Sequence, residues 1–260
     1  PYKGQEFNEK AEVVQKLEDA GAVLVAKLTS GALARGDVWF GGKTKNPWDL
    51  KQGASGSSAG SASATAAGLV AFSIGTETLG SIISPSTRCG ATGLRPTYGS
   101  VSRAGCMSLS WSMDKVGPIC RSAQDCAIVY SIIKGGSSTT ERDHTVVNYP
   151  FTFNPPADLS GYKIGYFKKL FDQDTSNVGS NNKGTLATLK ELGAELVEVD
   201  LPDSIPFDVF DVILRAEAGA FFDNLVLSHQ DREMVEQDKG SRANSLRQSR
   251  FITAVEYLQA

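Results

Sequence analysis

The sequence predicts a protein of the α/β class, because stretches with helical periodicity alternate with short runs rich in β-branched residues. Residues 10–20 place apolar side chains on one helical face, Gly21 ends that helix, and residues 22–26 read as a buried strand. A second helix, over about residues 182–192, also ends at a glycine, and the alternating run 195–201 follows it as a strand. Helices that alternate with strands in this way are typical of a sheet covered by helices.

The middle of the chain adds a capped helix and a further strand. Ser122, followed three residues later by Asp125, has the pattern of an N-cap for a helix over residues 123–133. Residues 135–161 are rich in Gly, Ser, Thr and Pro, which is typical of a long surface connection. Residues 163–167 then have the composition of a strand.

The two ends of the sequence lack the usual boundaries of a domain. No Met precedes Met107, and a final helix over residues 251–260 continues in helical period to the last residue without a glycine cap. A long helix over about residues 207–230 precedes it. We therefore expect residues 1–260 to form a single, incomplete domain that is truncated at one or both ends.

Composition excludes several classes of function. The 260 residues are 41% hydrophobic and 21% charged with a net charge of −3, so the basic excess of a nucleic-acid binder is absent. No apolar run approaches the ~18 residues of a membrane span, and no signal peptide is visible. The four cysteines have neither CxxC spacing nor a nearby His that would complete a zinc set. We expect a cytoplasmic protein with reduced thiols that uses no metal or cofactor and binds neither nucleic acid nor membrane, and we leave a homodimer open.

The most unusual segment is a tract of small residues over 53–68, which leads into the apolar run 69–74 and then into residues 75–85. Such a tract is usually a flexible linker, but this one continues directly into a small-residue helix and a buried strand. Small residues allow backbones to approach closely and expose their N–H groups. The tract lacks the Gly-Lys-Ser/Thr end of a phosphate-binding loop. It is therefore expected to build a site.

One interpretation of the tract is the nucleophile elbow of α/β-hydrolases. Residues 56–60 fit the G-x-S-x-G pattern, but an elbow follows a strand, and residues 46–52 do not resemble one. An elbow also needs a downstream His. The two candidates are His144, in a polar loop, and His229, near the end of a predicted helix, and both are expected to face solvent. The elbow is therefore the weaker interpretation.

A set of ordered motifs resembles the amidase signature family. The Gly-Ser-Ser-Ala-Gly-Ser run around Ser57 stands 24 residues ahead of Ser81, which lies in Gly-Ser-Ile. The resemblance is close over about residues 10–135 and implies a mixed, mostly parallel central sheet covered by helices on both faces. The family includes fatty-acid amide hydrolase, malonamidase and the A subunit of aspartyl/glutamyl-tRNA amidotransferase. The other matching segments are residues 46–49, 89–99, 101–103 and 113–118.

The resemblance implies a Ser–cis-Ser–Lys triad. Ser81 would attack the amide carbonyl and form an acyl-enzyme, while Ser57, preceded by a cis peptide bond, would pass the proton between Ser81 and a lysine. A desolvated lysine can be neutral near pH 7 and so act as the base. Backbone N–H groups of Thr78, Leu79 and Gly80 would form the oxyanion hole, in which one donor is typically worth ~3 kcal/mol.

Two positions depart from the family. Its catalytic lysine lies in an upstream motif which, counted back from Ser57, falls before Pro1, so we expect this segment to lack its base. Lys27 is the alternative, but its surroundings are more typical of a surface lysine. Many members have an arginine where this sequence has Ile83, and that arginine can bind a substrate carboxylate. Ile83 and Ser58 are therefore expected to line a pocket for a neutral or apolar acyl group.

Several other conspicuous residues have a structural interpretation. Glu77 lies four residues before Ser81 and is expected, like Asp114, to form hydrogen bonds that shape loops. Cys89 is expected to be a buried packing residue. Three tryptophans are expected in the core or in pocket walls: Trp39, Trp48 and Trp111.

These observations predict hydrolysis of a small linear carboxylic amide through an acyl-Ser81 intermediate. Two other hypotheses remain. The first is the glutaminase subunit of a tRNA-dependent amidotransferase, which would need partner subunits and against which Ile83 argues. The second is a non-catalytic, amidase-like scaffold.

Overall fold

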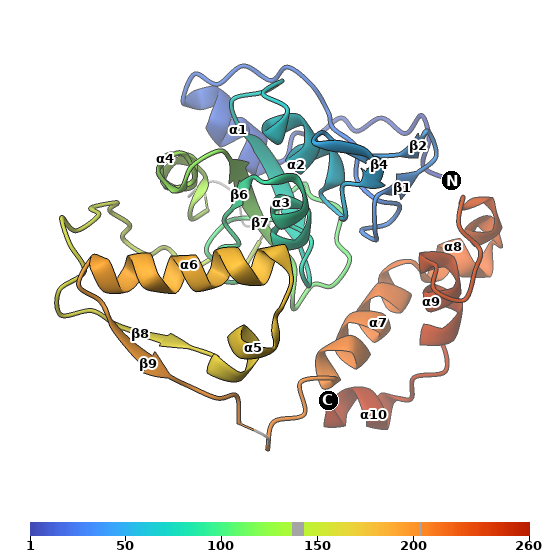
Figure 1. Cartoon of the computed structure of the whole chain (residues 1–260). Coiled ribbons are helices and arrows are strands. Elements are labelled where there is room, and N and C mark those ends of the chain that lie inside the picture. The colour runs from blue at the N-terminus through green and yellow to red at the C-terminus, as the bar shows by residue number, and fades with distance from the viewer. Residues whose placement is uncertain (137–142, 203) are drawn as a thin grey trace. The chain divides into compact units, whose positions relative to one another are not determined.

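The computed structural model describes residues 1–136, 143–202 and 204–260 and divides into two compact units (Figure 1). The larger unit combines Pro1–Phe153 with Asp208–Ala260, and the smaller unit is Asn154–Phe207. The single domain expected over residues 1–260 stays a prediction. Part of the surface connection expected over 135–161 lies outside the described residues.

The larger unit is built around a three-stranded sheet with the strand order β5-β7-β6. Strand β7 (Lys115–Cys120) is central and pairs antiparallel with both β5 (Ser73–Glu77) and β6 (Thr92–Gly93). Among the described strands, parallel pairing occurs only in the smaller unit, so the mostly parallel arrangement is not found in this sheet. Connections of different lengths join its strands, and these connections decide whether two strands pair parallel or antiparallel. The amino-acid composition does not reveal that outcome.

Helices cover both faces of this sheet, as expected. Successive side chains of a strand point to opposite faces. Val116 and Cys120 accordingly pack into one cluster with apolar residues of α1 and α4, whereas Ile119 packs on the opposite face with alanines of α2. The four helices around the sheet are α1 (Glu12–Asp19), α2 (Ala59–Ala66), α3 (Ile83–Cys89) and α4 (Ala123–Ile133).

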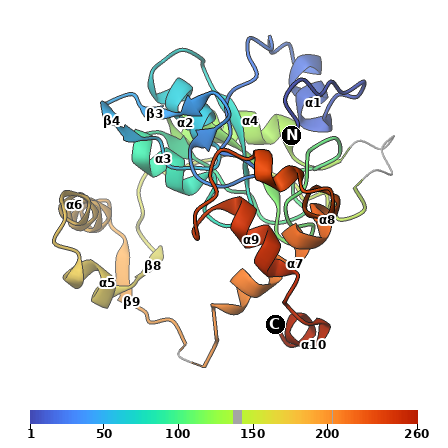
Figure 2. The ribbon, with the colours of Figure 1, turned by 90° about the vertical axis from the view of Figure 1, so that its right-hand side faces the viewer.

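The C-terminal part of the larger unit is helical (Figure 2). Its apolar cluster includes Phe222, Leu225 and Leu246 and also reaches Leu109, which comes from the first part of the unit. The long helix expected over 207–230 is interrupted at Phe222, which has a non-helical φ of −99° and ψ of +21°. The elements are α7 (Val209–Phe221), α8 (Asp223–Leu227), the 3-10 helix η1 (Gln230–Glu233), α9 (Arg242–Ser249) and α10 (Ala254–Gln259).

The smaller unit confirms the helix and the strands expected there. Strand β8 (Lys163–Tyr166) pairs parallel with β9 (Glu195–Glu198), and α6 (Asn177–Glu191) precedes β9. The short helix α5 (Lys168–Gln173) follows β8. Across the described parts of both units, no helix combines the length and the apolar character needed to cross a bilayer.

Two short antiparallel hairpins precede α2. Residues 46–52 were not expected to contain a strand, yet most of them belong to the second hairpin. The longer strand of that hairpin, residues 49–53, is polar and largely exposed, so it lacks the apolar alternation by which strands are recognised. The strands are β1 (Val38–Trp39) with β2 (Gly42–Lys43), and β3 (Lys45–Asn46) with β4 (Asp49–Gly53).

The helix expected over 123–133 has the predicted boundaries, and the Ser122 side chain accepts a hydrogen bond from the Asp125 N–H at 3.1 Å. The buried strand expected over 22–26 is wrong. Val23 and Val25 are 81% and 71% exposed, and no described strand pairs with this segment. Apolar β-branched residues favour a strand only where a neighbouring strand supplies the hydrogen bonds.

Candidate active site

The loop that carries Ser81 joins β5 to α3. Gly80 adopts a φ of +85° with open space where a side chain would lie, and its carbonyl accepts the N–H of Ser84 at 2.8 Å. Glycine adopts this left-handed backbone without steric cost. Ser81 follows directly and is 8% exposed. The glycine thus turns the chain so that the serine stands at the start of the helix.

Glu77 fixes the far side of this loop. Its carboxylate Oε2 accepts the backbone N–H groups of Ile82 and Ile83 at 2.7 and 3.0 Å, and the residue is 2% exposed. Arg95 lies 3.9 Å from the other carboxylate oxygen. A carboxylate at a helix N-terminus satisfies N–H groups that lack helical partners. The structural interpretation of Glu77 is therefore confirmed.

Ser57 lies just before α2 and is 1% exposed. The peptide bond between Gly56 and Ser57 is cis, as the resemblance implied. The Ser57 carbonyl accepts the N–H of Gly31 at 2.9 Å and the hydroxyl of Ser30 at 3.0 Å. Its own Oγ is buried without a hydrogen-bond partner, and among the buried side-chain nitrogen and oxygen atoms of the described residues only Ser86 Oγ shares this condition. Because buried hydroxyls are nearly always bonded, the Ser57 hydroxyl remains available to another group.

Ser58 connects the two serine loops. Its backbone N–H donates to the carbonyl of Ser81 at 3.1 Å. Its hydroxyl donates to the Thr76 carbonyl and accepts the Thr76 N–H, both at 3.0 Å. The structure thus brings together Ser57, Ser58 and Ser81, although the Ser58 hydroxyl is committed to β5. The place of Ser58 in a substrate pocket stays a prediction.

Thr78 is held by two side chains from the start of β7. Its hydroxyl donates to Asp114 at 2.5 Å, and the Lys115 ammonium donates to its carbonyl at 3.0 Å. Asp114 also accepts the N–H groups of Leu109 and Ser110 at 2.7 and 3.0 Å, which confirms its loop-shaping interpretation. Burial lowers the pKa of Lys115, and the positive charge of the nearby Arg95 lowers it further. Thr78 is therefore fixed through both its hydroxyl and its carbonyl.

A cavity of about 190 Å³ opens beside Thr78. Two residues of opposite charge, Asp114 and Lys115, line it together with an apolar wall that includes Met107 and Trp111. Trp111 is 45% exposed, consistent with the wall position expected for it.

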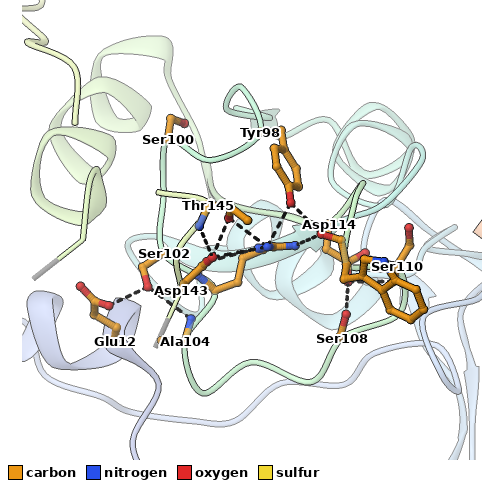
Figure 3. Close-up of polar contacts among 12 residues, drawn as sticks. Glu12, Tyr98, Ser100, Ser102, Ala104, Ser108, Ser110, Asp114, Asp143 and Thr145 are labelled. Carbon is orange, nitrogen blue, oxygen red and sulfur yellow. Dashed lines mark hydrogen bonds and ion pairs between the residues drawn. The ribbon is translucent and has the colours of Figure 1, made fainter. Parts of the chain in front are cut away.

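A polar network around Arg103 borders this cavity and was not anticipated from the sequence. The guanidinium lies 3.3 Å from Asp143 and donates to Thr145 Oγ1 at 3.0 Å and to the Tyr98 hydroxyl at 3.2 Å. Figure 3 shows the close grouping of Asp143, Thr145, Tyr98 and Asp114. Burial alone would raise the pKa of Asp143, but hydrogen bonds from Thr145 and Arg103 lower it to about 2. The sequence feature that could have pointed to Arg103 is the Val-Ser-Arg motif over residues 101–103, which matches the family.

The remaining predicted site residues lie at the surface of the loop. Leu79 is 56% exposed, and Ile83 is 44% exposed at the first turn of α3. Lys27 is also exposed, with its ammonium 5.9 Å from the centre of the Phe7 ring. No described contact joins Lys27 to either serine.

Three further predictions have mixed outcomes. Trp48 is 75% exposed rather than buried, although its indole N–H donates to the Cys89 carbonyl at 2.7 Å. Cys89 is fully buried as expected, and burial raises the pKa of its thiol to about 11. His144 and His229 are both exposed, as expected.

Comparison with known proteins identifies the family. A family model described as Amidase matches residues 3–255. The chain belongs to the amidase family. The α/β class and the amidase-signature fold are thereby confirmed, although the strands of the larger unit's three-stranded sheet pair antiparallel.

Curated relatives of this amidase-family chain include the A subunit of glutamyl-tRNA(Gln) amidotransferase from Staphylococcus epidermidis. That protein is 39% identical over 231 residues, which cover 85% of this chain and 47% of the relative. The corresponding protein of Oleidesulfovibrio alaskensis is 38% identical over 230 residues, covering 85% and 47%. The amidase-family chain thus spans about half the length of these relatives.

Solved structures of the same family superimpose on the chain. The A subunit of glutamyl-tRNA(Gln) amidotransferase from Thermotoga maritima has a TM-score of 0.76 and 34% identity, with 88% of this chain and 52% of that chain covered. The native peptide amidase of Stenotrophomonas maltophilia has a TM-score of 0.78 and 27% identity, with 96% and 57% covered. The fold is therefore common to amidases and amidotransferase subunits.

Proposed function

We propose that this amidase-family chain carries the nucleophile of an enzyme that hydrolyses a linear carboxylic amide through an acyl-Ser81 intermediate. The observation that carries the proposal is the hydrogen bond between Ser58 N–H and the Ser81 carbonyl, next to the buried, unpartnered hydroxyl of Ser57. Two serines on adjacent loops, one with a free hydroxyl, suit a nucleophile and a proton relay.

In the proposed reaction, Ser81 Oγ attacks the amide carbonyl carbon while its proton passes to Ser57 Oγ. Ser57 in turn gives its own proton to a lysine, which the family places upstream of the residues that match here. The carbon–nitrogen bond then breaks, the amine leaves with a proton from the same relay, and water hydrolyses the ester on Ser81. Each proton transfer needs a partner within hydrogen-bond reach. The Ser58–Ser81 backbone contact, which holds the two serine loops side by side, supports this relay.

We propose backbone N–H groups of Thr78, Leu79 and Gly80 as the oxyanion hole. The double anchoring of Thr78 by Asp114 and Lys115 supports this role, because an oxyanion hole works by holding donors in place before charge develops. The left-handed Gly80 supports it further, since it sets the direction of the loop.

For the substrate we propose an amide whose acyl group is neutral or apolar. Ile83 stands, partly exposed, two residues beyond Ser81 and offers no hydrogen-bond donor to a substrate carboxylate. Ser58 would form part of the same pocket through its backbone. The peptide amidase among the similar structures is compatible with such a substrate.

The proposal is tested with the complete gene product and a panel of amides that differ in acyl charge and length. Ser81→Ala should abolish hydrolysis, and Ser57→Ala should reduce kcat by at least about 10³-fold, since loss of one member of a catalytic triad removes most of the rate. Ser86→Ala is the matched control, because it removes the other buried, unpartnered hydroxyl. Full activity in Ser81→Ala would refute the assignment.

A second candidate is the glutaminase subunit of a tRNA-dependent amidotransferase, which the names of the curated relatives favour. It predicts that the complete gene product co-purifies with partner subunits and hydrolyses glutamine. Absence of both, with hydrolysis of neutral amides intact, would leave the first proposal.

We also propose a cytoplasmic location and catalysis without metal or cofactor. All four cysteines are free thiols, which suits a reducing compartment. Activity that survives dialysis against a chelator would support catalysis without metal, and loss of activity restored by a divalent cation would refute it. Whether the protein forms a homodimer is decided by its mass in solution.

A further inference from the structure

Arg242, the first residue of α9, connects the C-terminal helices to a loop near Ser57. It is 5% exposed and donates from Nε to the Leu33 carbonyl at 3.0 Å and from Nη2 to the Ala34 carbonyl at 3.2 Å. None of the ion pairs in the described part of the chain involves it. Burial, together with the positive charge of the nearby Arg35, lowers the pKa of Arg242 to about 10; burial is the larger cause. Burying a guanidinium that has no ion pair is unfavourable, and the two hydrogen bonds to the Leu33 and Ala34 carbonyls compensate for it.

The loop that Arg242 contacts, residues 31–37, has an unusual backbone. Leu33 and Ala34 have φ values of +47° and +59°, a region that residues with a Cβ rarely adopt. Such a conformation persists only when its surroundings determine it. Residues 32–34 pack on the apolar cluster of α7, α8 and α9, and Arg242 adds hydrogen bonds to that contact. The C-terminal helices therefore determine the shape of this loop.

The other side of the 31–37 loop supports Ser57. The Gly31 N–H donates to the Ser57 carbonyl at 2.9 Å. The Gly36 carbonyl packs so closely on Gly56 that a Cβ on Gly56 would lie 1.8 Å from it. Any displacement of the loop therefore moves the backbone that carries the Ser57 hydroxyl.

We propose that Arg242 is a positioning residue, which holds the 31–37 loop so that Ser57 keeps its proton-relay geometry toward Ser81. This inference rests on the function proposed above. Arg242 would not touch the substrate. Its loss would therefore lower kcat more than it changes KM, because a misplaced relay slows the chemical step.

The test compares Arg242→Met, Arg242→Lys and Arg247→Met. Arg247 is the matched control: it lies on the same helix but donates to Asp231 at 2.5 Å and to Gln237 at 2.7 Å rather than to the 31–37 loop. For each variant, kcat and KM are measured in the complete gene product, together with Tm and backbone hydrogen exchange of residues 30–37. We expect Arg242→Met to lower kcat about 10–100-fold and to speed exchange at Gly31, with KM within about two-fold. Arg242→Lys, which keeps a donor, should be intermediate.

Arg247→Met should lower Tm while leaving kcat and exchange at Gly31 unchanged. The inference is overturned if Arg242→Met keeps the wild-type kcat, or if kcat falls in both variants in proportion to Tm. Should Arg242→Met fail to fold, Arg242→Lys decides, because a folded lysine variant with normal kcat and normal exchange also overturns it. Ser81→Ala separates this outcome from failure of the proposed function: if that variant remains active, the catalytic assignment itself is wrong.

Discussion

The backbone N–H of Ser58 donates to the carbonyl of Ser81 across 3.1 Å, although 22 residues separate them in the chain. This bond joins the start of α2 to the start of α3. The Ser58 hydroxyl meanwhile binds both polar groups of the Thr76 backbone. The loops that carry Ser57 and Ser81 are therefore held next to each other by contacts that use neither the Ser57 nor the Ser81 hydroxyl.

Replacement of Glu77 by Gln should destabilise the larger unit by about 1–2 kcal/mol, because the charged acceptor of two backbone N–H groups becomes neutral. Urea unfolding measures this change. Glu195→Gln is the control, since the exposed Glu195–Lys163 pair, at 3.3 Å, should contribute about 0–1 kcal/mol. Equal effects of the two substitutions would contradict the role of Glu77.

Thr78→Val should lower kcat about 10-fold with little change in KM, because it removes the hydroxyl that Asp114 holds while preserving side-chain volume. The matched control is Thr65→Val, which removes a fully buried hydroxyl bonded to Ser73 at 2.9 Å. Thr65→Val should cost about 1 kcal/mol of stability and leave kcat unchanged. A normal kcat in Thr78→Val would show that the anchor does not serve catalysis.

Asp143→Asn should destabilise the protein at pH 6 but not at pH 2. The pKa of Asp143 falls from its ordinary value of 3.8 to about 2 on folding, so the folded state favours the charged form. The resulting stability is present above about pH 4 and is lost as the pH falls toward 2. The Tm difference between wild type and variant should therefore shrink over that range. A difference that is independent of pH would exclude the Arg103–Asp143 pair as its cause.

Ile83→Arg should shift specificity toward amides that carry a carboxylate on the acyl group. A new charge-assisted hydrogen bond is typically worth about 1.5–3 kcal/mol, which corresponds to about 10-fold or more in the ratio of kcat/KM values. The measurement compares a neutral amide with an acid-bearing amide of the same length. Ile83→Met should leave the ratio unchanged, and an unchanged ratio in Ile83→Arg would remove this position from the acyl pocket.

Local signals in the sequence were enough to predict many of the elements. The Ser122 cap and the glycines that follow α1 and α6 act within a few residues, so the helices they bound could be recognised directly. The segment 22–26 misled for the opposite reason, because a strand needs a hydrogen-bonding neighbour that composition cannot supply. Strand direction in the central sheet depended likewise on distant connections.

The candidate site divides in the same way. Ser57 and Ser81 could be named because their motifs are short and their spacing is specific. The Arg103–Asp143 pair and the Arg242 contacts join positions 40 and more than 200 residues apart, and no local pattern shows which residues become partners. Side chains that support a loop from a distance are visible only once the chain is folded.

The central claim is that Ser81 becomes acylated. The most direct test incubates the complete gene product with a fluorophosphonate probe and locates the adduct by peptide mass spectrometry. We predict a single adduct on Ser81, absent in Ser81→Ala and much slower to form in Ser57→Ala. An adduct on a different residue, or an unmodified Ser81 in protein that actively hydrolyses amides, would contradict it.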